Sequence, residues 1–95
     1  PIKVAVFPLM NKKNMPEISQ KIVEDVRHAG IASFYDAGGS IGKRYRRQDE
    51  AGTPFGITVD HDTLEDNTVT LRYRDTMKQE RISIDKIITI LNNKF

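Results

Sequence analysis

The sequence predicts an α/β fold in which a mixed sheet carries helices on its faces. In the first half of the chain, short apolar runs rich in β-branched residues alternate with segments of helical periodicity. That alternation is typical of parallel strands joined by helical crossovers. The second half contains two strand-like segments separated by a short polar turn, which predicts an antiparallel hairpin. The expected element order is β-α-β-α-β-β-β-α.

The first strand is predicted over residues 2–7, IKVAVF, because an uninterrupted apolar run of this kind is typical of a buried parallel strand. The first helix is predicted over residues 16–29, where apolar residues recur at helical spacing. Pro16 suits its first turn, and Gly30 fits the position after its last turn. A second short strand, Ile31–Tyr35, follows and implies a parallel crossover.

A glycine-rich turn, a basic helix and a third strand form the unit around which the chain is organised. The turn is residues 38–40, in which Ser40 can accept a hydrogen bond from a free N–H of the next helix. The helix is predicted over Ile41–Ala51, and the stretch 52–54 ends it. The apolar run Phe55–Val59 is the third strand. Units of this type place ligands at the ends of their strands.

The last third of the chain predicts a hairpin and a final helix. Residues 60–66 are expected to form a polar, acidic loop. Residues 68–74 alternate between apolar and polar side chains, which predicts a half-buried strand. Residues 77–82 are its predicted partner, and Ser83 can cap a last helix whose apolar stripe extends to Leu91.

Length and composition limit the function classes. Ninety-five residues with a hydrophobic fraction of 38% predict one domain, residues 1–95. Because the chain is already strand-like at Ile2, we expect this domain to be excised from a longer protein. The absence of cysteine excludes disulfides and thiolate sites. Neither a membrane-spanning apolar run nor a secretory signal is found, so we expect a cytoplasmic location. A net charge of +2 does not by itself imply a nucleic-acid partner.

The charges are nevertheless segregated along the chain. Four basic residues lie within the predicted second helix: Lys43, Arg44, Arg46 and Arg47. Such a cluster can bind phosphates electrostatically, although a solvated helix face is the alternative. The glycine turn before this helix can present free N–H groups to an anion or a base edge. Its alternative is a tight turn that requires positive φ.

The acidic segment and the arginine-bearing strand suggest base recognition. A carboxylate only accepts hydrogen bonds, and the base edge that offers it a donor is the cytosine amino group. The alternatives for residues 60–66 are a solvated loop or a metal site, whose spacing matches no EF-hand. Arg72 and Arg74 point to the same side of their strand and can reach or stack on bases. Cross-strand pairing with Glu80 or another carboxylate of the hairpin is the alternative. No catalytic constellation is present, so an acyl-transfer site is not expected.

Two stretches resemble a known family: the opening IKVAVFPLMNK and the longer run GSIGKRYRRQDEAGTPFGITVDHDTLEDNTVTLRYRD. Both are similar to the C-terminal anticodon-binding domain of class IIa glycyl-tRNA synthetases of the archaeal/eukaryotic type. The resemblance implies a three-layer domain with a five-stranded mixed sheet of order 2-1-3-4-5. Strand four would be antiparallel, and three helices would flank the sheet.

The resemblance also implies a function. The chain would bind the anticodon stem-loop of glycine tRNA, whose anticodons end in two cytosines, for a glycine–tRNA ligase. Aminoacylation, with ATP and Mg²⁺, would belong to the catalytic domain of the same longer chain, and this domain would need no cofactor. The parent enzyme is expected to be a homodimer. The alternatives are a stand-alone paralogue serving as an accessory or protein-interaction domain, and a flavodoxin-like enzyme acting on a small ligand.

Site residues follow from the same resemblance. Base reading is implied for Gly39, Ser40, Asp60, Thr63, Glu65, Arg72 and Arg74, and contact with the RNA backbone for Lys43, Arg46 and Arg47. Neither a catalytic residue nor a metal ligand is implied. We expect the substitution Arg72→Ala to weaken binding of glycine tRNA with little effect on folding.

Overall fold

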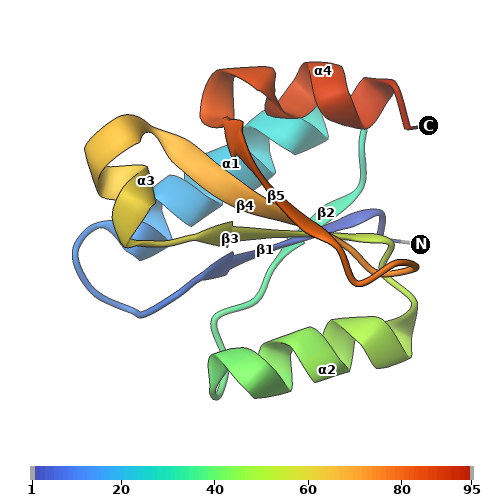
Figure 1. The fold of residues 1–95 in the computed structure, drawn as a ribbon, viewed down its shortest axis with the longest axis horizontal. Helices are drawn as coiled ribbons and strands as arrows, with labels where there is room; N and C mark the ends of the chain where they lie inside the picture. Colours follow the sequence, from blue (N-terminus) through green and yellow to red (C-terminus); the bar gives the residue numbers. More distant parts are fainter. Residues whose placement is uncertain (1, 95) are drawn as a thin grey trace.

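A computed structural model describes residues 2–94, so Pro1 and Phe95, the ends of the predicted domain, lie outside the described part. Five strands form one sheet with helices on both faces (Figure 1). The elements in chain order are β1 (Val4–Pro8), α1 (Met15–His28), β2 (Ser33–Tyr35), α2 (Ile41–Ala51), β3 (Phe55–Val59), α3 (His61–Asp66), β4 (Thr68–Tyr73), β5 (Gln79–Ser83), a 3₁₀ turn η1 (Ile84–Lys86) and α4 (Ile87–Asn92).

The strand order is β2-β1-β3-β4-β5, as the resemblance implies. Strand β1 runs parallel to both of its neighbours, so that Val6 lies opposite Tyr35 on β2 and Ile57 on β3. Strand β4 is antiparallel to β3 and to β5. The prediction of a mixed sheet with an antiparallel fourth strand is confirmed.

The aliphatic core lies between the sheet and the helices α1 and α4. It consists mainly of alternate strand residues and of one stripe from each helix: Val4, Val6, Ile57, Val59, Val69, Leu71, Met15, Ile22, Val26, Ile87 and Leu91. Helix α2 lies on the opposite face (Figure 1), where the Tyr45 ring contacts the Phe7 ring edge-on at a centroid distance of 5.3 Å. Period-2 alternation in the strands separates these two layers.

One prediction about this region was wrong. Residues 60–66 contain a short helix, α3, where we expected a loop. The Asp60 carboxylate accepts a hydrogen bond from the Thr63 N–H at 3.3 Å, and the Thr63 hydroxyl accepts one from the Asp60 N–H at 3.0 Å. This reciprocal capping box stabilises a helix of only six residues, too short for apolar periodicity to reveal it. Three helices flank the sheet as expected, and α3 is an additional one at its edge.

Element boundaries differ slightly from the predicted ones. The second strand is limited to Ser33–Tyr35. Strand β5 begins at Gln79, after a connection in which Met77 adopts a positive φ of 60°. Within residues 2–94, none of the helices combines the length and the apolar character that crossing a membrane requires.

Candidate nucleic-acid interface

One edge of the sheet holds five of the ten predicted binding residues. Because β1, β2 and β3 are parallel, their carboxyl ends meet at this edge. The loop 9–14 follows β1, the turn 36–40 follows β2, and Asp60 with α3 follows β3. Figure 1 shows these segments together on the left of the view. We call this region the strand-end edge.

Arg44 holds the turn of the strand-end edge in place. Although it belongs to the predicted basic cluster, it is only 4% exposed. Its guanidinium donates to the carbonyl oxygens of Gly39 at 2.9 Å, Gly38 at 3.3 Å and Pro8. One side chain thus ties the end of β1 to the turn before α2. Arg44 therefore acts as a structural group here and offers no free charge to a phosphate.

Asp36 provides a second anchor for the same turn. Its buried carboxylate accepts from Arg47 Nη2 at 2.7 Å and Nε at 3.0 Å, and from Gln48 Nε2 at 3.1 Å. The Gly38 N–H also donates to it, at 3.2 Å. Burial raises the pKa of the Asp36 carboxyl, but the hydrogen bonds, led by Arg47, outweigh burial and hold that pKa below its usual value. The Arg47 charge is therefore already partly neutralised.

The other predicted contact residues of the glycine turn and of the exposed side of α2 are accessible to solvent. Lys43 and Arg46 lie on the exposed surface of α2. Gly39 is exposed and has a φ of 71°, and its neighbour Ser40 caps α2 through a hydrogen bond from the Lys43 N–H at 3.3 Å. The turn thus requires positive φ, and it also stands open at the start of a helix, so both interpretations of the glycine turn remain compatible with its geometry.

Asp60 is paired with an arginine that the sequence analysis did not single out. Arg81 Nη1 donates to Asp60 Oδ2 at 3.0 Å, and Arg81 Nη2 contacts Oδ1. Thr70 Oγ1 also donates to Asp60 Oδ2, at 3.2 Å. Burial raises the pKa of the Asp60 carboxyl, but the hydrogen bond and charge of Arg81, together with hydrogen bonds from Thr63 and Thr70, outweigh burial and lower that pKa overall. The hairpin register places Arg81 opposite Thr70, so an alternation argument along β5 would have revealed Arg81.

Thr63 and Glu65, the other two residues of the strand-end edge that are predicted to read bases, differ in accessibility. Thr63 is only 4% exposed, and its hydroxyl is engaged in capping α3. Glu65 is exposed on α3. The structure therefore places Asp60, Thr63 and Glu65 at the strand-end edge, with Glu65 the most accessible of the three.

Arg72 and Arg74 lie toward the opposite end of β4. Arg72 is opposite Gly56, and the four-residue separation from Thr68, at the other end of β4, corresponds to roughly 13 Å. Arg72 Nη1 and Nη2 donate to the Asp49 carboxylate at 2.8 and 3.0 Å. The Arg72 guanidinium also stacks 4.9 Å from the centroid of the Tyr45 ring.

These contacts correct two expectations about Arg72. Its carboxylate partner is Asp49 of α2, whereas Glu80 accepts a hydrogen bond from the Tyr73 hydroxyl at 2.5 Å. Because Arg72 is only 9% exposed and joins α2 to β4, we expect its removal to lower stability, which replaces the expectation of little effect on folding. Arg74 is more accessible, with 41% of its side chain exposed, and donates to the Asp49 backbone carbonyl at 3.1 Å.

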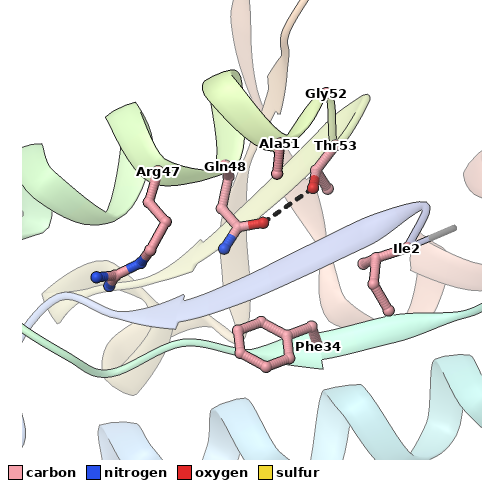
Figure 2. A pocket seen from close by; sticks show the side chains of 7 residues that line it. All are labelled: Ile2, Phe34, Arg47, Gln48, Ala51, Gly52 and Thr53. Atoms are coloured by element: carbon pink, nitrogen blue, oxygen red, sulfur yellow. Dashed lines mark hydrogen bonds between the residues drawn. The ribbon is translucent and has the colours of Figure 1, made fainter.

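A hollow beside α2 lies apart from the strand-end edge. A groove lies between β2 and the C-terminal half of α2, lined by Ile2, Phe34, Arg47, Gln48, Ala51, Gly52 and Thr53 (Figure 2). Its volume is about 400 Å³. Gln48 accepts a hydrogen bond from the Thr53 hydroxyl at 2.9 Å across its upper wall. Arg47 is the single predicted contact residue in this lining. Within residues 2–94, no three metal-ligating side chains gather in a group that could hold an ion.

The comparisons with known proteins agree with one another on the family. A family described as "Anticodon binding domain" matches residues 3–94. A glycine–tRNA ligase of Rhodopirellula baltica is 53% identical over 95 residues, covering 99% of this chain and 17% of the ligase. A glycine–tRNA ligase of Methanococcus maripaludis strain C6 is 50% identical over 94 residues, covering 99% of this chain and 16% of that protein. The chain therefore spans less than a fifth of these relatives.

Solved structures share the fold at lower identity. A prolyl-tRNA synthetase of Cryptosporidium parvum superposes with a TM-score of 0.90 at 18% identity, covering 98% of this chain and 20% of that one. The RNA-binding domain of a threonyl-tRNA synthetase from Cryptosporidium parvum Iowa II superposes with a TM-score of 0.87 at 21% identity. That match covers 98% of this chain and 23% of the threonyl enzyme chain.

Proposed function

The chain belongs to the anticodon binding domain family, and from this premise we propose that it binds the anticodon stem-loop of glycine tRNA as part of a glycine–tRNA ligase. The observation that carries the proposal is the identity of about half, across 99% of the chain, to glycine–tRNA ligases. The polar, partly cationic strand-end edge supports it, because single-stranded RNA is read by hydrogen bonds and stacking at such exposed sites.

Base reading is proposed for the residues that the resemblance implies. The Asp60 carboxylate is an acceptor of the kind that the cytosine amino group requires, and Glu65 offers a second one nearby on α3. Gly39 and Ser40 present the turn before α2, and Thr63 positions Asp60 through the capping box. Arg72 and Arg74, farther along β4, would contact a base at the other end of the surface.

Phosphate binding is proposed for the exposed cations of α2. Lys43 and Arg46 are exposed, and Arg47 has half of its side chain exposed although Asp36 shares its charge. Contacts of this kind strengthen RNA binding without sequence preference and weaken as salt rises. Lys43 and Arg46 should therefore contribute more to the salt dependence than Arg47.

The activity of the whole enzyme would lie outside this chain. We expect aminoacylation, with its ATP and Mg²⁺, in a catalytic domain of the same longer polypeptide, and no cofactor in this domain. A homodimeric parent enzyme and a cytoplasmic location are further parts of the proposal. They are supported by the resemblance to glycyl-tRNA synthetases.

A binding comparison tests the proposal. The chain is titrated with a glycine-tRNA anticodon stem-loop and with the same stem-loop carrying uracil at both cytosines, at two salt concentrations. Tighter binding of the cytosine loop at both salt concentrations is expected, because uracil lacks the amino donor. Equal, salt-sensitive binding of both loops would argue for a general RNA surface. Absence of binding to either would favour an accessory or protein-interaction role.

A further inference from the structure

Arg81 lies on the part of the sheet that faces the same side as α2 but remains accessible beside it. Along β4 and β5 this surface is formed by Thr68, Thr70, Gln79 and Arg81, which are half-buried or exposed. The side chain of Arg81 is 33% exposed. Neither composition nor the family resemblance assigned this residue a role.

The contacts of Arg81 use the edges of its guanidinium group. Nε donates to Thr68 Oγ1 at 2.8 Å, and Nη1 donates to Thr70 Oγ1 at 2.9 Å. Nη1 also donates to Asp60 Oδ2 at 3.0 Å, Nη2 contacts Asp60 Oδ1, and Nη2 lies 3.4 Å from the Thr68 carbonyl oxygen. The five N–H groups of a guanidinium lie in its plane. All of its edge donors therefore face protein acceptors.

Because these edge donors are engaged, any part of the Arg81 guanidinium group that a ligand can reach is a face of its plane. Thr68 and Thr70 project from the same face of β4, since they are two residues apart on one strand. A planar group bonded to both hydroxyls and to Asp60 extends across the sheet surface, held at its edges. Guanidinium planes stack well on nucleobases, and a plane that is already fixed loses little freedom when a base binds.

We propose that the exposed face of the Arg81 guanidinium is a stacking platform for one unpaired nucleobase of the bound anticodon loop. This inference rests on the function proposed above and adds a base-binding position on β5. A base stacked on Arg81 lies directly beside Asp60, so that the platform and the carboxylate serve the same or adjacent nucleotides.

Arg72 and Arg74, the two arginines predicted to read bases, do not offer this geometry. Arg72 is also held at its edge by a carboxylate, but the ring of Tyr45 covers its face and only 9% of the residue is exposed. Arg74 is exposed but donates from Nε to one backbone carbonyl and from Nη1 to the exposed Asp75. Of these three arginines, Arg81 is the one whose edge donors are all engaged while a third of its side chain stays exposed.

The test uses stem-loops that carry a fluorescent base analogue, 2-aminopurine or pyrrolocytosine, at one unpaired position at a time. Arg81→Lys keeps the positive charge and a contact to Asp60 but removes the plane. We expect one position to be quenched by the unmodified chain and not by this variant, together with a roughly tenfold loss of affinity. The slope of affinity against salt should stay unchanged, because the charge is retained.

Arg27→Lys is the matched control. Arg27 donates from Nε and Nη2 to the Ser33 carbonyl at 3.2 and 3.0 Å, from α1 on the other face of the sheet. The Arg27→Lys variant loses an equivalent planar group away from the proposed platform, so we expect its affinity for the stem-loop and its fluorescence quenching to be unchanged.

A second measurement does not depend on any variant folding. In the unmodified chain, the Arg81 Nε proton should shift upfield in the NMR spectrum when the stem-loop binds, because a stacked base shields it. An unshifted Arg81 resonance, or equal affinity and quenching for Arg81→Lys, overturns the platform. If the cytosine preference persists in that case, the proposed function stands. If the unmodified chain fails to bind the stem-loop, both proposals fall.

Discussion

At the scale of single residues, burial decides what each arginine of this chain does. Arg44 is 4% exposed and ties the turn 36–40 to the end of β1. Arg72 is 9% exposed and joins β4 to α2 through Asp49. Arg81 keeps one third of its side chain exposed while its edge is bonded. Residues of one type therefore serve as an internal brace, an ion pair between elements and a candidate platform.

This difference leads to a prediction for two neighbouring arginines. Arg72→Ala should lower the free energy of unfolding by about 1–3 kcal/mol, because it removes charged hydrogen bonds from a buried position. Arg74→Ala, whose side chain is 41% exposed, should change it by less than about 0.5 kcal/mol. Urea denaturation of the two variants measures both effects. Equal stabilities for Arg72→Ala and the unmodified chain would contradict the structural role of Arg72.

At the scale of elements, α2 is defined at both ends by its own residues. Ser40 accepts a hydrogen bond from the Lys43 N–H, and Gly52 ends the helix with a φ of 79°. Only glycine adopts that conformation without steric cost. These local signals explain why the predicted and observed bounds of this helix coincide at Ile41 and Ala51. Helix α3 is instead stabilised by the reciprocal hydrogen bonds of two side chains, Asp60 and Thr63. The polar character of this segment did not by itself predict those hydrogen bonds.

Two glycine substitutions test the backbone account of α2. Gly52→Ala should destabilise the chain by about 1 kcal/mol, since a Cβ at this φ is strained although nothing lies within 4 Å of it. Gly42→Ala, inside the helix and equally uncrowded, should stabilise by about 0.4–1 kcal/mol. Thermal and urea unfolding measure the two changes. A loss of similar size in both variants would mean that φ is not the cause.

At the scale of the whole molecule, three aspartates connect segments that are distant in sequence. Asp36 binds Arg47 of α2, Asp49 binds Arg72 of β4, and Asp60 binds Arg81 of β5. Hydrogen bonding from Arg72 lowers the pKa of Asp49, and the pKa values of Asp36 and Asp60 are lowered despite burial. Each folded-state pKa therefore lies below the ordinary value of 3.8.

Stability should consequently fall in acid. A lowered folded-state pKa contributes stability that is complete above the unfolded-state pKa and is lost as pH falls through the folded-state value. We expect the free energy of unfolding to decline once pH drops below about 4, where aspartate protonates in the unfolded chain. Urea titrations at pH 7, 5 and 3 measure this decline. Asp36→Asn should make it shallower, and an unchanged pH dependence in that variant would argue against the Asp36–Arg47 contact.

The sequence by itself determined the order of the five strands and of the three helices that flank the sheet, the alternating faces of residues 68–74, and the family, but not the short helix α3. Apolar periodicity and the glycine and serine signals at helix ends act over a few residues, so they can be read along the chain. The family resemblance extended this information to the strand order, which no local pattern contains. The implied base-reading and phosphate-binding roles stay predictions, which the stem-loop titration addresses.

Only the tertiary structure decided which charged groups are free. Asp36 and Arg47 are 11 positions apart, Asp60 and Arg81 are 21 apart, and Asp49 and Arg72 are 23 apart. Such pairs form because crossovers and hairpins bring distant segments together, and their register determines which charges meet. Exposure follows from that packing. The assignment of Arg81 as a candidate platform and of Arg44 as a brace thus depends on contacts that exist only in the folded chain.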